Sequence, residues 1–269
     1  MEERERENLL GAGGERFWYE SVKTFVYKET PQGALEMHVH LPHDLQPGQQ
    51  RPGIVFFFGG GWLGGTTRQF ERQAAYLSGK GMIAARADYR VKSRHGVAPD
   101  ACVQDAKSAV RWLRQHAGEL CIDPARLVAS GGSAGAHMAA CTALVEGFEA
   151  EGEDRSIPCR PDALLLYNPV LQVLPRHIPE MVPTAEMGER ISPVRFVDER
   201  TPPTLLIYGT EDELGDPAPL YVQAATAAGS RAELYLAEGQ KHGFFNESPW
   251  YEPTLERAEA FLRSLGYLS

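Results

Sequence analysis

Residues 126–146 read RLVASGGSAGAHMAACTALVE, and this stretch decides the fold. Its first part, residues 126–130, is typical of a strand, and residues 134–146 are predicted to form a helix. Between them lies GGSAG, residues 131–135, a G-x-S-x-G pattern in the strand-turn-helix context that a nucleophile elbow requires. Small residues around Ser133 permit a sharp turn that presents its hydroxyl beside the helix N-terminus. The alternative is a glycine-rich turn in another doubly wound protein, which the flanking pattern disfavours.

Strands and helices alternate on both sides of this stretch. The run IVFFF, residues 54–58, is apolar at every position, as expected of a strand buried between two helix layers. Repeated strand-helix-strand units with right-handed crossovers produce a doubly wound sheet. We therefore predict an α/β fold with a mostly parallel eight-stranded sheet and helices on both faces. The predicted strands are 22–29, 34–41, 54–58, 82–89, 126–130, 163–167, 204–208 and 233–236, and the predicted helices are 69–79, 99–117, 134–146, 219–228 and 253–265.

Length and composition favour a single domain over residues 1–269. The chain is 43% hydrophobic and 23% charged, which is ordinary for a globular protein and excludes a disordered one. Residues 1–20 are interpreted as an N-terminal extension. Residues 170–201 are rich in proline and break the alternation, so we predict a small insertion over the top of the sheet, a candidate lid.

Charge and hydropathy also limit the partners. The net charge is −9 and basic residues do not cluster, which argues against nucleic acid and anionic membranes as partners. Residues 1–7, MEERERE, lack the apolar segment of a secretory signal, so we expect the chain as given to be cytoplasmic. His38, His40 and His43 lie on or beside a strand expected near a sheet edge, and are predicted to face solvent rather than bind a metal. Oligomeric state stays open.

A second glycine-rich motif follows the buried strand. Residues 58–62 read FGGGW, in the loop position that supplies part of an oxyanion hole. Bare backbone amides can approach a substrate carbonyl closely, so we assign an oxyanion hole to the N–H groups of Gly60, Gly61 and Ala134. Neither the dinucleotide fingerprint nor the Walker pattern is present, which makes a nucleotide site a poor alternative.

A serine hydroxyl needs an imidazole base, and the base needs a carboxylate to fix its tautomer. In this fold class the acid and the histidine follow the serine in that order. Asp212 comes after the strand 204–208 and His242 after the strand 233–236, both at the carboxyl end of the sheet. We therefore predict Ser133, Asp212 and His242 as the catalytic residues. Asp216 is a second candidate for the acid, and Asp212 is preferred because it comes first after the strand.

Other polar and aromatic residues lie near this predicted site in sequence. Trp62, Leu63, Asn168 and Phe244 are predicted to bind substrate as walls of an acyl or alcohol pocket, although such residues can equally belong to the core. The motif DYR, residues 88–90, and Asp105 are predicted to anchor loops through hydrogen bonds and ion pairs.

With these motifs the chain resembles the α/β-hydrolase serine esterases, in particular the acetyl esterase and lipase group near the hormone-sensitive-lipase family. The motifs are FGGGW at 58–62, ADYR at 87–90, GSAG at 132–135 and HGFF at 242–245. The resemblance implies the α/β-hydrolase fold and hydrolysis of short-chain esters, above all acetyl esters, without a cofactor. Phe58 stands where the family usually has histidine, and Gly132 where its closest lipases have aspartate. The short region before residue 58 implies a reduced cap and an open site, which suggests an acetylated carbohydrate as a hypothetical substrate.

Three alternatives use the same residues. Formamidase-like or prolyl-oligopeptidase-like enzymes of this fold cleave amides or peptides, and triad chemistry alone does not separate them from esterases. A non-catalytic binding protein could keep the fold, although retention of the serine, acid and histidine disfavours it. Acyl transfer to an alcohol other than water differs only in how the site excludes solvent.

Overall fold

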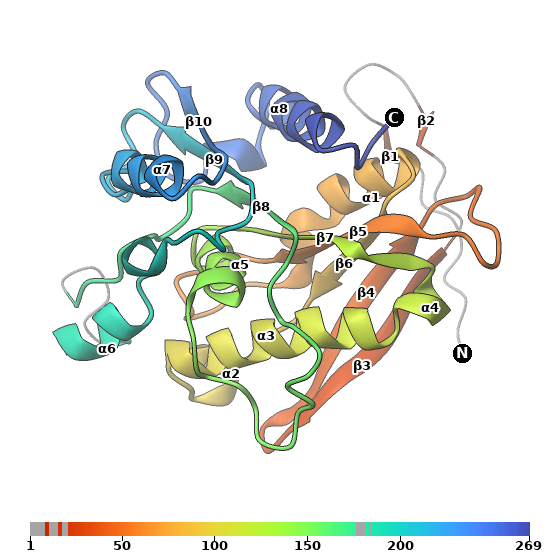
Figure 1. The fold of residues 1–269 in the computed structure, drawn as a ribbon, viewed down its shortest axis with the longest axis horizontal. Coiled ribbons are helices and arrows are strands. Elements are labelled where there is room, and N and C mark those ends of the chain that lie inside the picture. The colour runs from red at the N-terminus through yellow and green to blue at the C-terminus, as the bar shows by residue number, and fades with distance from the viewer. Residues whose placement is uncertain (1–8, 11–15, 18–20, 176–180, 183) are drawn as a thin grey trace.

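The computed structural model describes residues 9–10, 16–17, 21–175, 181–182 and 184–269. Its centre is an eight-stranded sheet with the order β10-β9-β8-β7-β5-β6-β4-β3 (Figure 1). Neighbouring strands from β10 to β6 run parallel, whereas β4 pairs antiparallel with β6 and with β3. The predicted mostly parallel eight-stranded sheet is therefore confirmed. The strands are β3 (Ser21–Thr30), β4 (Gly33–Leu41), β5 (Arg51–Phe57), β6 (Ile83–Ala87), β7 (Ile122–Gly132), β8 (Ala163–Tyr167), β9 (Thr204–Gly209) and β10 (Ala232–Ala237).

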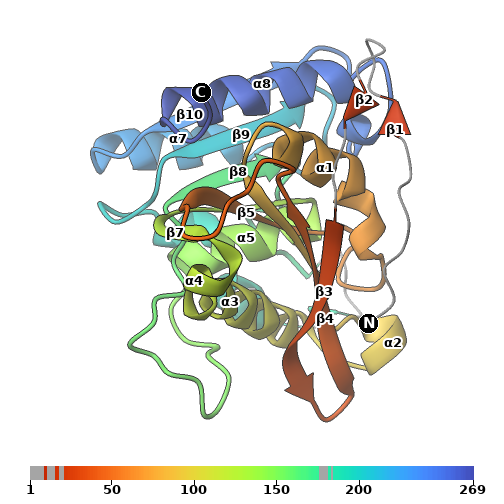
Figure 2. The ribbon, with the colours of Figure 1, turned by 90° about the vertical axis from the view of Figure 1, so that its right-hand side faces the viewer.

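Helices cover both faces of this sheet. Helices α1 and α8 pack on one face, and α3, α5 and α7 pack on the other (Figure 2). The long helices are α1 (Glu71–Gly79), α3 (Pro99–Gln115), α5 (Ala134–Leu144), α7 (Ala218–Ala227) and α8 (Tyr251–Ser264), and the short ones are α2 (Lys92–His95), α4 (Ala117–Leu120), α6 (Ala185–Arg190) and the 3-10 helices η1 (Thr67–Phe70), η2 (Pro193–Phe196) and η3 (Phe244–Asn246).

The two faces divide the apolar residues of each central strand. In β5, Ile54 and Phe56 join the core beneath α1 and α8, whereas Val55 and Phe57 join the core beneath α3 and α5. Successive side chains of a strand point to opposite faces, so a strand covered on both sides needs apolar residues at every position. This is why the run IVFFF predicted a buried strand correctly.

The segments outside the main sheet are only partly described. Most of the predicted N-terminal extension lies outside the described residues. The part that is described is an antiparallel pair of strands, β1 (Leu9–Leu10) and β2 (Arg16–Phe17). Across the residues placed by the structure, no helix combines the length and apolar character that a membrane span requires.

The predicted exposure of the three early histidines is wrong for His40. At this end of the sheet the edge strand is β3, so β4 lies inside the sheet between β3 and β6. His40 is buried, and its Nε2 accepts a hydrogen bond of 3.0 Å from Arg86 Nε. Burial, together with the neighbouring charge of Arg86, lowers the pKa of His40 to about 3, so the ring is neutral. His43, in contrast, is exposed as predicted.

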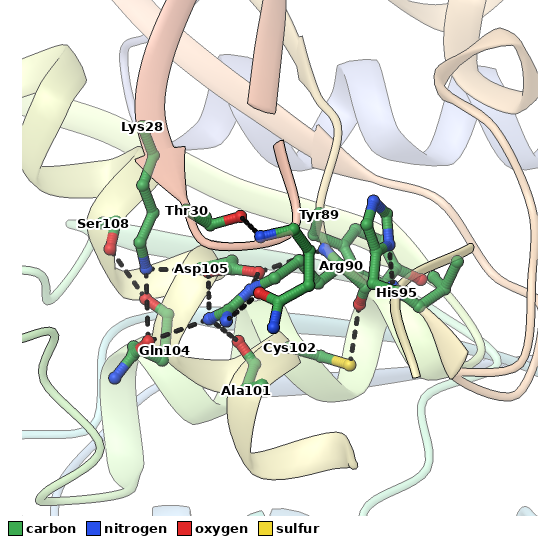
Figure 3. Close-up of polar contacts among 12 residues, drawn as sticks. Lys28, Thr30, Tyr89, Arg90, His95, Ala101, Cys102, Gln104, Asp105 and Ser108 are labelled. Carbon is green, nitrogen blue, oxygen red and sulfur yellow. Dashed lines mark hydrogen bonds and ion pairs between the residues drawn. The ribbon is translucent and has the colours of Figure 1, made fainter. Parts of the chain in front are cut away.

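A buried carboxylate joins the edge hairpin to the helix layer. Asp105 on α3 is fully buried and accepts hydrogen bonds from Arg90 Nε at 2.8 Å, Arg90 Nη2 at 2.9 Å and Lys28 Nζ at 2.7 Å (Figure 3). Lys28 lies on β3 and Arg90 follows β6. The predicted anchoring role of Arg90 and Asp105 is therefore visible in the structure, while Asp88 pairs with Arg94.

We expect Asp105→Ala to lower the free energy of unfolding by about 3–5 kcal/mol, because it leaves two largely buried cations without their carboxylate. Asp100→Ala is the matched control on the same helix, since Asp100 is exposed and should contribute less than about 1 kcal/mol. Denaturant unfolding of both variants checks this. Equal losses in the two variants would contradict the assigned role of Asp105.

Candidate active site

Ser133 sits in the turn between the central strand β7 and helix α5. Its backbone has φ 54° and ψ −119°, a strained conformation for a residue with a side chain. The Ser133 N–H donates to the carbonyl of Tyr167 at 2.9 Å, which holds the turn against β8. A Cβ on Gly135 would lie 2.0 Å from the carbonyl oxygen of Phe57, so only glycine fits there. The sequence pattern therefore has a steric cause.

The structure brings the three predicted catalytic residues into hydrogen-bond contact. His242 Nε2 lies 2.8 Å from Ser133 Oγ, and His242 Nδ1 lies 3.1 and 3.0 Å from the two carboxylate oxygens of Asp212. With Nδ1 facing the carboxylate, the ring carries its proton on Nδ1, and Nε2 can accept the serine proton. Asp216, the second candidate for the acid, is exposed.

Asp212 is held as a buried, ionised carboxylate. Its side chain has no exposed surface, its Oδ1 accepts a 3.0 Å hydrogen bond from the Leu214 N–H, and its Oδ2 accepts one from Asn168 Nδ2. Burial alone would raise the pKa of Asp212, but hydrogen bonds from His242, Leu214 and Asn168 outweigh it and lower the pKa. The carboxylate can therefore stabilise a positively charged His242.

The glycine-rich loop after β5 lies next to this arrangement. Gly60 has φ +128°, and a Cβ there would lie 2.3 Å from the carbonyl oxygen of Gly64, so the loop requires glycine at this position. The Gly60 carbonyl accepts from the N–H of Leu63 at 3.0 Å, which closes the turn. Within the described part of the chain, the N–H groups of Gly60, Gly61 and Ala134 donate no backbone hydrogen bond in the turns and loops.

Trp62 follows these glycines, and its side chain is held in place by a hydrogen bond to His137. Its side chain is buried, and its indole N–H donates to His137 Nδ1 at 3.3 Å. The other ring nitrogen of His137, Nε2, lies 2.7 Å from the carbonyl oxygen of Ile191, to which it donates. Burial lowers the pKa of His137 to about 4 despite that hydrogen bond, so the ring is neutral and joins the glycine loop to the predicted insertion.

A cavity of about 600 Å³ opens beside His242. Much of its wall is apolar and comes from the predicted insertion, with charged side chains in the wall on the Asp212 and His242 loops. Of the predicted substrate-binding residues, Trp62 lines it, whereas the described lining includes neither Leu63, Asn168 nor Phe244. The lining residues are Trp62, Val170, Val173, Leu174, Val182, Glu211, Asp212, Glu213, Leu214, Lys241 and His242.

The three other predicted substrate-binding residues lie outside the lining of this cavity. Asn168 is buried behind Asp212 and orients it. Leu63 is 37% exposed on the loop beyond Trp62. Phe244 packs edge-on against Trp250, with ring centroids 5.7 Å apart.

The apolar wall from the insertion was missed by sequence reasoning, although an apolar cluster within a proline-rich segment could have signalled it. Part of this insertion, residues 176–180 and 183, lies outside the described residues.

The known proteins to which this chain is similar include several esterases. A family model described as BD-FAE matches residues 37–159. Carboxylesterase NlhH of Mycobacterium tuberculosis is 28% identical over 220 residues, which cover 72% of this chain and 67% of that protein. A probable isoprenylcysteine alpha-carbonyl methylesterase of Arabidopsis thaliana, ICMEL1, is 26% identical over 245 residues. The match covers 82% of this chain but only half the length of the Arabidopsis protein.

Solved structures give a more extensive match. The thermophilic esterase Est2 of the planctomycete Thermogutta terrifontis is 41% identical, with a TM-score of 0.87 over 92% of this chain and 94% of that chain. Similar scores hold for the same esterase with propionate bound, with butyrate bound, and phosphorylated by paraoxon.

Proposed function

Because the chain belongs to the α/β-hydrolase family of serine carboxylic ester hydrolases, we propose that it hydrolyses short-chain acyl esters through an acyl-enzyme on Ser133. The observation that carries this proposal is the 2.8 Å contact between Ser133 Oγ and His242 Nε2, with Asp212 on the opposite side of the ring. A nucleophile, its base and the residue that orients the base thus lie in one line.

The proposed reaction has two halves. Ser133 Oγ attacks the acyl carbon while its proton passes to His242 Nε2, and negative charge develops on the carbonyl oxygen. The N–H groups of Gly60, Gly61 and Ala134 stabilise this charge. The positive end of the α5 helix dipole stabilises it further. The alcohol leaves with the proton from His242, and water then attacks the acyl-enzyme by the same route to release the acid.

Size and polarity of the cavity support short acyl chains with an apolar tail. Val170, Val173 and Val182 supply branched side chains to its wall, and Trp62, whose indole N–H donates to His137, forms another part of the wall. The related Thermogutta esterase has been seen with propionate and with butyrate bound, acids of the proposed length. Acetyl esters, including those of carbohydrates, fall within the same size class.

We expect hydrolysis of p-nitrophenyl esters to be fastest for acetate to butyrate, and to fall by at least tenfold for acyl chains longer than about eight carbons, because a longer chain outgrows the cavity. The measurement is kcat/KM across the series, with a matched acetanilide and acetylated xylose as further substrates. Faster cleavage of the anilide than of the ester would replace this proposal with an amidase.

A further inference from the structure

Two side-chain amides join the glycine loop to the loop of the catalytic histidine. Gln69, on η1, accepts a hydrogen bond of 2.6 Å from the backbone N–H of Gly59. Its Nε2 donates to Asn246 Oδ1 at 3.0 Å, and Asn246 Nδ2 donates to the carbonyl of Gly243 at 2.8 Å. Gly59 directly precedes the proposed oxyanion donors, and Gly243 directly follows His242. The chain of hydrogen bonds therefore runs from one half of the proposed machinery to the other.

The direction of this chain is determined at both ends by the backbone. Gly59 presents an N–H, which only the oxygen of a side-chain amide can accept, and Gly243 presents a carbonyl, to which only the nitrogen of a side-chain amide can donate. The Gln69 oxygen must therefore face Gly59, and the Asn246 nitrogen must face Gly243. In that arrangement the remaining Gln69 nitrogen meets the remaining Asn246 oxygen as donor and acceptor. A carboxylate at either position could not complete the chain, because it cannot donate.

Aromatic packing holds the same two segments together beside the amides. Phe70, the neighbour of Gln69, stacks on Phe245, the neighbour of Asn246, with ring centroids 5.8 Å apart. Phe245 in turn lies against the nucleophile turn, since a Cβ on Gly132 would come within 2.6 Å of its ring. The helices η1 and η3 are therefore joined by a polar and an apolar contact, beside the turn that carries Ser133.

We propose that Gln69 and Asn246 are positioning residues, which set the distance between the oxyanion donors and His242 without touching the substrate. This inference rests on the proposed function. Joint alignment of the oxyanion donors and the histidine matters in the transition state, when charge develops on the acyl oxygen and a proton moves to the imidazole. It does not matter for binding of the substrate. Loss of the amide chain should therefore affect turnover far more than substrate binding.

The test measures kcat and KM separately for Gln69→Met, Asn246→Ala and the double variant, with a p-nitrophenyl acetate substrate. We expect each single variant to lower kcat 10- to 100-fold while KM changes less than about threefold, since small misplacements of aligned groups cost that much. The double variant should be no slower than the slower single variant, because either change alone breaks the chain. Gln223→Met, on the exposed face of α7, is the matched control and should keep the wild-type kcat.

Isosteric variants keep the test valid if the truncations do not fold. Gln69→Glu and Asn246→Asp preserve side-chain volume but remove the donor, and they should show the same loss of kcat while still unfolding cooperatively. A kcat within threefold of wild type in all folded variants, or losses that multiply in the double variant, would overturn the inference. If those variants stay active while Ser133→Ala is inactive, only this inference fails; if wild type itself cleaves no ester, the proposed function fails with it.

Discussion

Replacing Ser133 with alanine is expected to lower kcat for p-nitrophenyl acetate about 10⁵- to 10⁶-fold. The hydroxyl is the only group that His242 Nε2 meets at 2.8 Å in the described site, and without it no acyl-enzyme can form. The remaining rate should come from the oxyanion donors and binding alone. Ser156→Ala is the matched control, because Ser156 lies on an exposed loop, and it should keep full activity.

Covalent labelling separates loss of the nucleophile from loss of the fold. Paraoxon phosphorylates the related Thermogutta esterase, and we expect it to add one diethylphosphoryl group to wild type and none to Ser133→Ala. Peptide mass spectrometry with fragmentation should place the group on Ser133 rather than on Ser130, whose hydroxyl is buried and donates to the Leu165 carbonyl. An adduct on another residue, or more than about 1% residual turnover in the variant, would refute the assigned nucleophile.

Replacing Asp212 with asparagine is expected to lower kcat about 10³- to 10⁴-fold with little change in KM. An asparagine oxygen can still accept from the Leu214 N–H, and Asn168 can rotate to accept from the new amide nitrogen. That amide nitrogen then also faces His242 Nδ1, which favours the tautomer with the proton on Nε2. The ring would then present a donor to Ser133 and could not take its proton.

Asp216→Asn is the control that decides which acid is used. Asp216 is exposed and lies four residues further along the same loop, so its variant should keep wild-type kcat. A crystal structure of Asp212→Asn should show the His242 ring in place. The NMR signal of the hydrogen-bonded ring proton of His242 should show the changed tautomer. Equal losses in the two variants would contradict the assignment of Asp212.

The local pattern of the chain predicted the elements well where burial is uniform. Ser133 of the G-x-S-x-G motif lies between β7 and α5 as expected, and the close approach of Gly135 to the Phe57 carbonyl explains why the motif has glycine there. The apolar run 54–58 indicated a strand covered on both faces. The predicted exposure of His40 was wrong because the sequence shows which side chains of a strand share a face, but not which strands lie on either side of it.

Sequence alone thus determined the fold class, which follows from periodicities and motifs within short segments, and it predicted Ser133, Asp212 and His242 as the catalytic residues from the chain order usual in that fold class. Only the tertiary structure decided what surrounds them. Asn168 proved to donate a hydrogen bond to Asp212, and Gln69 met Asn246 across 177 residues of chain. Such contacts depend on how the strands are ordered in the sheet and on how their loops meet above it. They therefore have no signature in the residues nearby in sequence.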